Sequence, residues 1–316
     1  MIRKHFLLDA HADILYRMET EQLDFTDAGS PLHLSYPKME QGEIDVQIFA
    51  LFVDPPYTPH EHLAKLLAYI DTFRSEVCAD NLMLPVYTYK DLETNLRAGR
   101  KSAILSVEGA DFLTGDLRHL RILYSLGVRA MGLTWNHANS IASGVGEEID
   151  TGLTPFGREV VREMNRLGMV IDVSHMAPKG VEGVLEASSK PVIASHSNAK
   201  SIYNHRRNLN DDQIRQIAAK GGVIGVTFVP YFIGEGEVGI SHLLQHIDHM
   251  LSVGGEDHVG LGSDFDGIPE TMVDLRSGAD YPNLVEALDK EYGARITAKI
   301  CGGNFLRVLE RVLIEE

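Results

Sequence analysis

A histidine and an aspartate separated by one residue, His11 and Asp13, follow a short apolar run near the start of the chain. Residues two apart in an extended chain point to the same side. An imidazole and a carboxylate placed in this way can bind one metal cation together. A single pair of this kind is also common as an ordinary polar contact, so it indicates a metal site only in combination with further ligands.

Three further side chains of metal-binding type stand directly after apolar runs, namely Glu108, His175 and His196. A carboxylate at the end of a buried strand is costly unless it is paired or bound to metal. Taken alone, each of the three could be a helix cap, an ion-pair partner or a structural histidine. Taken with His11 and Asp13, the set favours a metal centre.

Five ligands exceed what one tetrahedral ion accepts, so the set predicts two ions. One ion is expected on His11 and Asp13. The other is expected on His175 and His196, with Glu108 as the bridge between the two. Nitrogen and oxygen ligands without thiolate suit Zn²⁺, while Mn²⁺, Fe²⁺ and Co²⁺ stay open as alternatives. The predicted cofactor is therefore two Zn²⁺ per chain.

Asp264 ends another apolar run, inside the stretch of residues 262–267. Its carboxylate could be a sixth metal ligand. It could equally be the group that moves a proton to and from a water activated by metal. The sequence pattern leaves these two roles open.

The elements that must position these side chains alternate between apolar runs and helical patterns. Eight apolar runs predict strands, over residues 6–9, 44–53, 103–107, 128–133, 169–173, 192–194, 223–228 and 259–261. Helical patterns are predicted over residues 60–77, 117–126, 154–168, 210–221, 241–254 and 295–314. Strands that alternate with helices favour a parallel sheet.

The predicted fold is α/β, a (β/α)₈ TIM-type barrel of the metal-dependent hydrolase type. Polar side chains end most of the apolar runs, and a barrel gathers the carboxyl ends of its strands on one face. A doubly wound open sheet, the main alternative, would spread them along an edge. We expect residues 1–316 to form a single barrel domain with a C-terminal helix.

The composition excludes several classes of protein. The chain has 45 acidic and 29 basic residues and a net charge of −16, which argues against nucleic-acid binding. No apolar run approaches the roughly 18 residues of a transmembrane helix, and the apolar start is too short for a signal peptide. We therefore expect a cytoplasmic protein without a membrane partner. Two cysteines, Cys78 and Cys301, do not indicate a disulfide framework.

The motifs together resemble the membrane dipeptidase (renal dipeptidase) family of zinc peptidases, in its soluble bacterial type. The similar stretches cover nearly the whole chain: DAHAD at 9–13, SVEG at 106–109, IDVSH at 171–175, ASHS at 194–197, RRNL at 206–209, DHVGLGSDFDG at 257–267 and GGNFLRV at 302–308. The resemblance implies the same five metal ligands, and it makes Asp264 the catalytic acid/base. It makes Arg207 the cation that binds the substrate carboxylate, with neighbouring Arg206 as the alternative.

One position departs from the family pattern. The mammalian members have a substrate-binding histidine directly after a Leu-Thr pair, whereas here Leu133 and Thr134 are followed by Trp135, with His137 two residues further on. Either His137 takes over the substrate contact, or Trp135 forms an apolar wall of the pocket. Both residues are candidates for substrate binding.

The resemblance implies hydrolysis of the peptide bond of dipeptides, including those with a D residue in second position. We expect a hydroxide that bridges the two zinc ions to attack the carbonyl carbon. Asp264 would then move the proton, and Arg207 would pair with the substrate carboxylate. Two alternatives stay open: another metal-dependent amidohydrolase acting on a cyclic amide, lactone or phosphoester, and a metal-binding barrel without catalysis. The sequence also leaves the oligomeric state open, a homodimer included.

Overall fold

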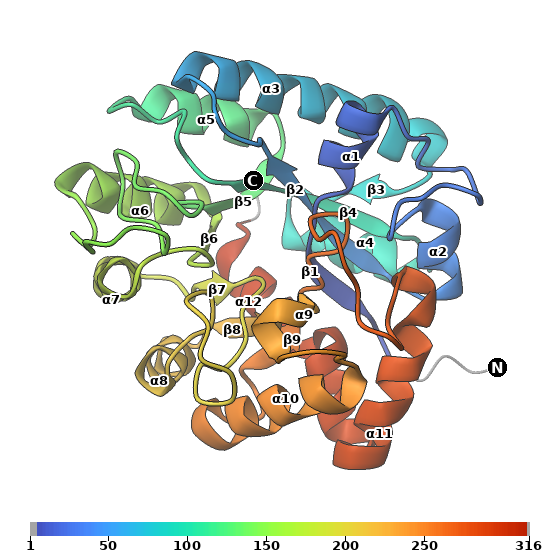
Figure 1. Cartoon of the computed structure of the whole chain (residues 1–316). Helices are drawn as coiled ribbons and strands as arrows, with labels where there is room; N and C mark the ends of the chain where they lie inside the picture. Colours follow the sequence, from blue (N-terminus) through green and yellow to red (C-terminus); the bar gives the residue numbers. More distant parts are fainter. Residues whose placement is uncertain (1–4, 315–316) are drawn as a thin grey trace.

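The computed structural model describes residues 5–314, and its centre is a ring of parallel strands surrounded by helices (Figure 1). The strands follow one another in the order β1-β2-β4-β5-β6-β7-β8-β9, and the short β3 pairs with β4 outside this path. A parallel bridge between Ala12 and Phe265 joins the two ends of the sheet. The chain thus forms the nearly closed (β/α)₈ barrel that the sequence predicts. The strand bounds are β1 Leu8–Ala12, β2 Val46–Phe52, β3 Leu84–Pro85, β4 Ser102–Glu108, β5 Val128–Gly132, β6 Val170–Asp172, β7 Ile193–Ala194, β8 Val223–Val226 and β9 Val259–Leu261.

Helices connect the strands and cover the outside of the ring (Figure 1). Side-chain caps define several of their starts, as at Thr58, whose hydroxyl accepts a hydrogen bond from the backbone N–H of Glu61. Such caps satisfy backbone N–H groups that the helix itself leaves unpaired. Within residues 5–314, no helix has both the length and the apolar character needed to cross a membrane. The helix bounds are α1 Ile14–Glu21, α2 Tyr36–Gln41, α3 Pro59–Thr72, α4 Tyr89–Arg97, α5 Leu117–Ser125, α6 Pro155–Leu167, α7 Pro178–Ala187, α8 Asp211–Ala219, α9 Pro230–Ile233, α10 Ile240–Gly254, α11 Tyr281–Ala298 and α12 Asn304–Val312.

Two predicted bounds are wrong in ways that affect packing. The first strand extends to Ala12, so His11 lies inside the strand and not after it. The single final helix expected over 295–314 is broken into the end of α11, a π-helical turn over Lys299–Gly303 and α12. The break occurs at Gly302, whose backbone is not helical. A Cβ there would lie 2.5 Å from the ring of Phe6, so this close approach requires glycine.

The apolar side chains of the strands alternate between two clusters. Phe49 and Leu105 face the outer helices, in the larger cluster. Ile48 and Ile104 face the other way, into a smaller cluster that also contains the apolar face of α12, including Phe305. This alternation follows from the two-residue period of a strand. Helix α12 thus packs against the interior side chains of the ring, and the carboxyl ends of the strands are left to carry the polar residues.

Candidate active site

The structure brings together all five residues predicted as metal ligands at the carboxyl ends of the strands. His11 lies in β1, and Asp13 follows it directly. Glu108 is the last residue of β4. His175 and His196 follow β6 and β7. All five side chains are buried.

The carboxylate of Glu108 lies between two groups of ligands. Its Oε2 is 3.4 Å from Nε2 of His11, and its Oε1 is 2.8 Å from Nε2 of His175 and 3.7 Å from Nε2 of His196. One compact group therefore contains Glu108 with His11 and Asp13, and the other contains Glu108 with His175 and His196. A carboxylate whose two oxygens face different ligand groups has the placement that a bridge between two ions requires.

Two of the three histidines in the cluster have pKa values shifted toward the neutral form. Burial, together with Arg207, lowers the pKa of His175 to about 4. Burial, together with His11, lowers the pKa of His196 well below its ordinary value. Both pKa shifts favour the neutral ring, which is the form that binds metal. Their Nε2 atoms lie only 2.9 Å apart, so the two nitrogens converge on one point.

His11 shows the opposite electrostatic behaviour. Burial by itself lowers the pKa of His11, but the carboxylates of Glu108 and Asp13 outweigh burial and raise that pKa well above its ordinary value. Its buried Nε2 has no hydrogen-bond partner among residues 5–314. The surroundings of His11 thus favour a positive charge, which is what a divalent cation would supply. The donor atoms and their charges fit two divalent cations.

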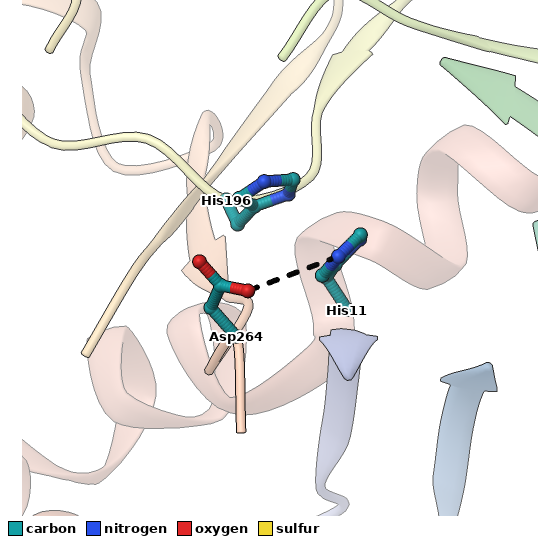
Figure 2. Close-up of side chains that lie close together, drawn as sticks. All are labelled: His11, His196 and Asp264. Carbon is teal, nitrogen blue, oxygen red and sulfur yellow. Dashed lines mark ion pairs between the residues drawn. The ribbon is translucent and has the colours of Figure 1, made fainter. Parts of the chain in front are cut away.

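Asp264 stands beside this cluster, after β9. Figure 2 shows its carboxylate facing His11 and His196, with Oδ1 4.0 Å from Nε2 of His11. Burial raises the pKa of Asp264 well above its ordinary value; Asp13 and Glu108 add to this effect while His11 opposes it. An aspartate with a raised pKa can exchange a proton at neutral pH more readily than an ordinary carboxylate. Because Asp264 also groups with His11 and His196 at ligand distances, the geometry leaves room for a ligand role.

A hydrogen-bonded chain fixes the ring of His196. Oδ1 of Asp172 accepts the backbone N–H groups of Ser174 and Ser195, each at 2.9 Å. The hydroxyl of Ser195 donates to Oδ2 of Asp172 at 2.5 Å and lies 2.8 Å from Nδ1 of His196. Since this hydroxyl donates its proton to Asp172, it accepts from Nδ1–H. The lone pair on Nε2 is then directed at the cluster, as metal ligands with a hydrogen-bonded second nitrogen require.

A similar arrangement joins β1 to the end of β9. Oδ1 of Asp9 accepts the backbone N–H groups of His11 at 3.2 Å and Ser263 at 2.8 Å. Its Oδ2 accepts the hydroxyl of Ser263 at 2.6 Å. This aspartate–serine pair holds the backbone on either side of the barrel closure, next to both His11 and Asp264.

His175 has its own orienting partner in Asn136, whose Oδ1 lies 2.8 Å from Nδ1 of the imidazole. An amide oxygen can only accept, so Nδ1 carries the proton and Nε2 is free to bind metal. His175 itself has φ 66°, and Asp264 and Asp266 have φ 65° and 67°. Residues other than glycine rarely adopt this left-handed region.

A cavity of about 300 Å³ opens in front of the cluster, and Arg207 lines it. Arg207 is buried; its Nη2 donates to the carbonyl oxygen of His196 at 3.1 Å, and its guanidinium lies 5.5 Å from the centre of the Phe232 ring. Across residues 5–314, no carboxylate lies within ion-pair distance of it. Arg206, by contrast, is exposed and donates to the carbonyl oxygen of Gly146. The geometry favours Arg207 over Arg206 as the cation that faces a ligand.

Trp135 and His137, the two candidates for the position that departs from the family pattern, lie in different places. Trp135 lines the cavity, with its ring 6.0 Å from that of His175. The side chain of His137 is 71% exposed, has Nδ1 3.5 Å from Glu147, and does not line the cavity. Asn136 occupies the cavity wall in its place.

Sequence reasoning missed the residues that support the ligands. The sequence pattern does not indicate the orienting roles of Asn136, Ser195 and Asp172. Its one hint is that a serine precedes each of the two ligand histidines, His175 and His196. Gly267 is also required by the site, because a Cβ there would lie 2.1 Å from Oδ2 of Asp13. Such contacts depend on chain segments that meet only in the folded barrel.

We expect Ser195→Ala to weaken divalent-metal binding about 10–100-fold, because His196 loses the partner of its Nδ1. Competition with a chromogenic zinc chelator measures this affinity. Ser197→Ala is the matched control, since the buried Ser197 hydroxyl has no hydrogen-bond partner in the part of the chain that the structure describes. Wild-type metal affinity in Ser195→Ala would contradict the role assigned to Ser195.

Comparisons with known proteins agree with the resemblance seen in the motifs. The family model described as membrane dipeptidase (peptidase family M19) matches residues 1–314. Two proteins named as uncharacterized dipeptidases from Schizosaccharomyces pombe are 36% and 32% identical to the chain, covering 88% and 96% of it and 73% and 80% of their own lengths. A metallopeptidase from Rhodobacter sphaeroides, solved with a phosphinate mimic of L-Ala-D-Ala, is 28% identical, with a TM-score of 0.92 over 98% of this chain and 100% of its own. The chain is therefore a hydrolase that belongs to the membrane dipeptidase family, peptidase family M19.

Proposed function

We propose that this protein is a dipeptidase that uses two zinc ions to hydrolyse the peptide bond of a dipeptide. The observation that carries the proposal is a buried Arg207, without a carboxylate partner among residues 5–314, in the same cavity as the metal-ligand cluster. A guanidinium in such a place suits a substrate carboxylate, which it can bind with two parallel hydrogen bonds. The cavity of about 300 Å³ is at the small end of ligand pockets, as a dipeptide requires.

In this proposal five residues bind the metal ions, and two further residues, Arg207 and Asp264, act on the substrate. When bound, the two zinc ions activate water as a nucleophile at neutral pH and polarise the scissile carbonyl group. Arg207 holds the carboxylate end of the dipeptide and so fixes the peptide bond over the cluster. Asp264 takes the proton of the attacking water and delivers it to the leaving amine nitrogen. Neither step requires a serine or cysteine nucleophile.

The stereochemistry of the second residue belongs to the same proposal. The related metallopeptidase from Rhodobacter sphaeroides was solved with a mimic of L-Ala-D-Ala. We infer that this chain likewise accepts a D residue in second position as well as an L residue. Its substrates would then include both L-L and L-D dipeptides.

We expect the zinc-loaded protein to release free amino acids from a panel of L-L and L-D dipeptides, as measured by chromatography of the products. Removing the metal with a chelator should abolish the release, and adding zinc back should restore it. Dipeptide amides, which lack the carboxylate for Arg207, should be poor substrates. If the zinc-loaded protein cleaves no free dipeptide in the panel, the proposed function is wrong.

Glu108→Gln should reduce the metal content below two zinc ions per chain. A neutral amide cannot balance two cations, and its two ends cannot both act as anionic ligands. Elemental analysis after zinc reconstitution measures the stoichiometry. Glu148→Gln is a control, because this exposed carboxylate lies outside the cavity lining. Two tightly held ions in Glu108→Gln would exclude Glu108 as the bridge.

Asp264→Asn separates proton transfer from metal binding. Asparagine keeps the shape of the side chain but cannot accept the proton, so kcat should fall about 10²–10⁴-fold. Metal content should stay near that of the wild type, and KM should change less than kcat. A metal assay and steady-state kinetics on one preparation give both values. Loss of metal in step with activity would show that Asp264 acts chiefly as a ligand.

A further inference from the structure

Three aromatic side chains form one side of the cavity, and we call Tyr16, Phe52 and Trp135 the aromatic wall. Their rings follow one another in contact: the ring centres of Tyr16 and Phe52 are 5.5 Å apart, and those of Phe52 and Trp135 are 5.3 Å apart. All three side chains are partly exposed. Aromatic rings that face a cavity offer apolar surface to a ligand. The contacts of the three rings with one another leave this surface exposed.

The aromatic wall begins directly beside the metal-ligand cluster. The ring centre of Trp135 is 6.0 Å from that of His175. A Cβ added to Gly109, the residue after Glu108, would lie 3.4 Å from the Cβ of Trp135. A substrate group that leaves the cluster on this side therefore meets the aromatic wall at once.

Arg207 belongs to the segment after β7, which lies across the ring of strands from β2 and is separated from β5 by β6 alone. The aromatic wall comes from α1, the end of β2 and the residues after β5, whereas Arg207 follows β7. In the strand order, β7 lies far from β2 (Figure 1, where β2 and β5 are above β7 and β8). A dipeptide has its carboxylate on the second residue. With this carboxylate on Arg207 and the peptide bond over the cluster, the first residue would extend away from Arg207, toward the part of the aromatic wall formed by Tyr16 and Phe52.

We propose that the aromatic wall binds the side chain of the first residue of the dipeptide, and that it makes the enzyme prefer a large, non-acidic side chain there. This inference rests on the proposed dipeptidase function. Burying a large apolar side chain against aromatic rings favours binding by about tenfold or more over glycine, which has no side chain to bury.

Asp54 supplies the preference against acidic side chains. It follows β2 directly, lines the cavity and is exposed. The other carboxylates that line the cavity are already engaged: Asp13, Glu108 and Asp264 face the cluster, and Asp266 pairs with Arg17 at 3.1 Å.

Among residues 5–314, no cation lies within ion-pair distance of Asp54. Its negative charge would therefore repel a glutamate at the first position of the dipeptide and attract a lysine there. The long apolar stem of a lysine side chain can also lie along aromatic rings while its charge stays in water. The wall and Asp54 thus act on the same substrate side chain.

The test compares five dipeptides, Gly-Ala, Leu-Ala, Phe-Ala, Lys-Ala and Glu-Ala, with the zinc-loaded wild-type enzyme and with wall variants. We expect kcat/KM for Leu-Ala and Phe-Ala to exceed that for Gly-Ala by about tenfold or more. Trp135→Ala should shrink this ratio, and Trp135→Phe should restore most of it. Equal kcat/KM for Gly-Ala, Leu-Ala and Phe-Ala in the wild type would overturn the inference while leaving the dipeptidase function intact.

Two variants, Asp54→Asn and Glu148→Gln, test the preference against an acidic side chain on the first residue of the dipeptide. Asp54→Asn should raise kcat/KM for Glu-Ala relative to Lys-Ala by several-fold, because the charge that repels glutamate is gone. Glu148→Gln, which removes an exposed carboxylate outside the cavity lining, should leave the ratio unchanged. An unchanged ratio in Asp54→Asn would remove Asp54 from the proposal.

Binding can be followed without turnover, because Trp135 is the single tryptophan of the chain. Phe-Ala added to the zinc-loaded Asp264→Asn variant should change the tryptophan emission, and Gly-Ala at equal saturation should change it less. This measurement also covers the case in which Trp135→Ala fails to fold. Emission that responds equally to both dipeptides would contradict contact between the first side chain and the wall. Failure of the enzyme to cleave any of the five dipeptides would instead count against the proposed function.

Discussion

The structure depends on one electrostatic constraint, the confinement of three carboxylates at the closed end of a single cavity. Asp13, Glu108 and Asp264 lie around His11 at ion-pair distances. Buried carboxylates at such spacing are unfavourable unless cations compensate them. Against the effect of burial, Glu108 and Asp13 raise the pKa of His11 above its ordinary value, whereas burial lowers the pKa of the other two ligand histidines, which therefore offer no compensating charge. Two divalent cations would balance the negative charge of the whole cluster. The ligands and the residues that orient them therefore suit metal binding.

The supports of the cluster are also part of the barrel. Asp172 and Ser195 join β6 to β7 while they hold the ring of His196. Asp9 and Ser263 join β1 to the residues after β9, where the sheet closes. The same hydrogen bonds therefore connect neighbouring strands and orient the residues at their ends. A substitution that weakens one of these hydrogen bonds would lower the stability of the barrel and would also change the geometry of the site.

The sequence predicted the barrel, and the five residues that it suggests as metal ligands lie together in the fold, because both features depend on local patterns. Apolar runs that end in chemically distinctive residues mark strands and their carboxyl ends, as at Glu108. The rest depends on contacts between distant segments. The sequence leaves His137 and Trp135 as alternatives, and only the fold of the turn after β5 places Trp135 at the cavity and His137 outside it. Phe52 ends an apolar run like any other core residue, and Tyr16 lies on a helix that the periodicity did not reveal. The broken final helix depends on Gly302, whose approach to the first strand has no local sign.

The left-handed backbone at His175, Asp264 and Asp266 has a consequence for how this protein can change over generations. Each of these conformations costs about 1–3 kcal/mol in a residue with a side chain, and glycine would relieve it. At His175 and Asp264, selection for stability alone would favour glycine and selection for chemistry opposes it, whereas Asp266 also accepts backbone N–H groups of His33 and Leu34 that stabilise the fold. A lineage released from the need for catalysis should lose these residues early and become more stable as it does so. Substitutions at these left-handed residues should therefore be the first to appear in a lineage that no longer needs catalysis.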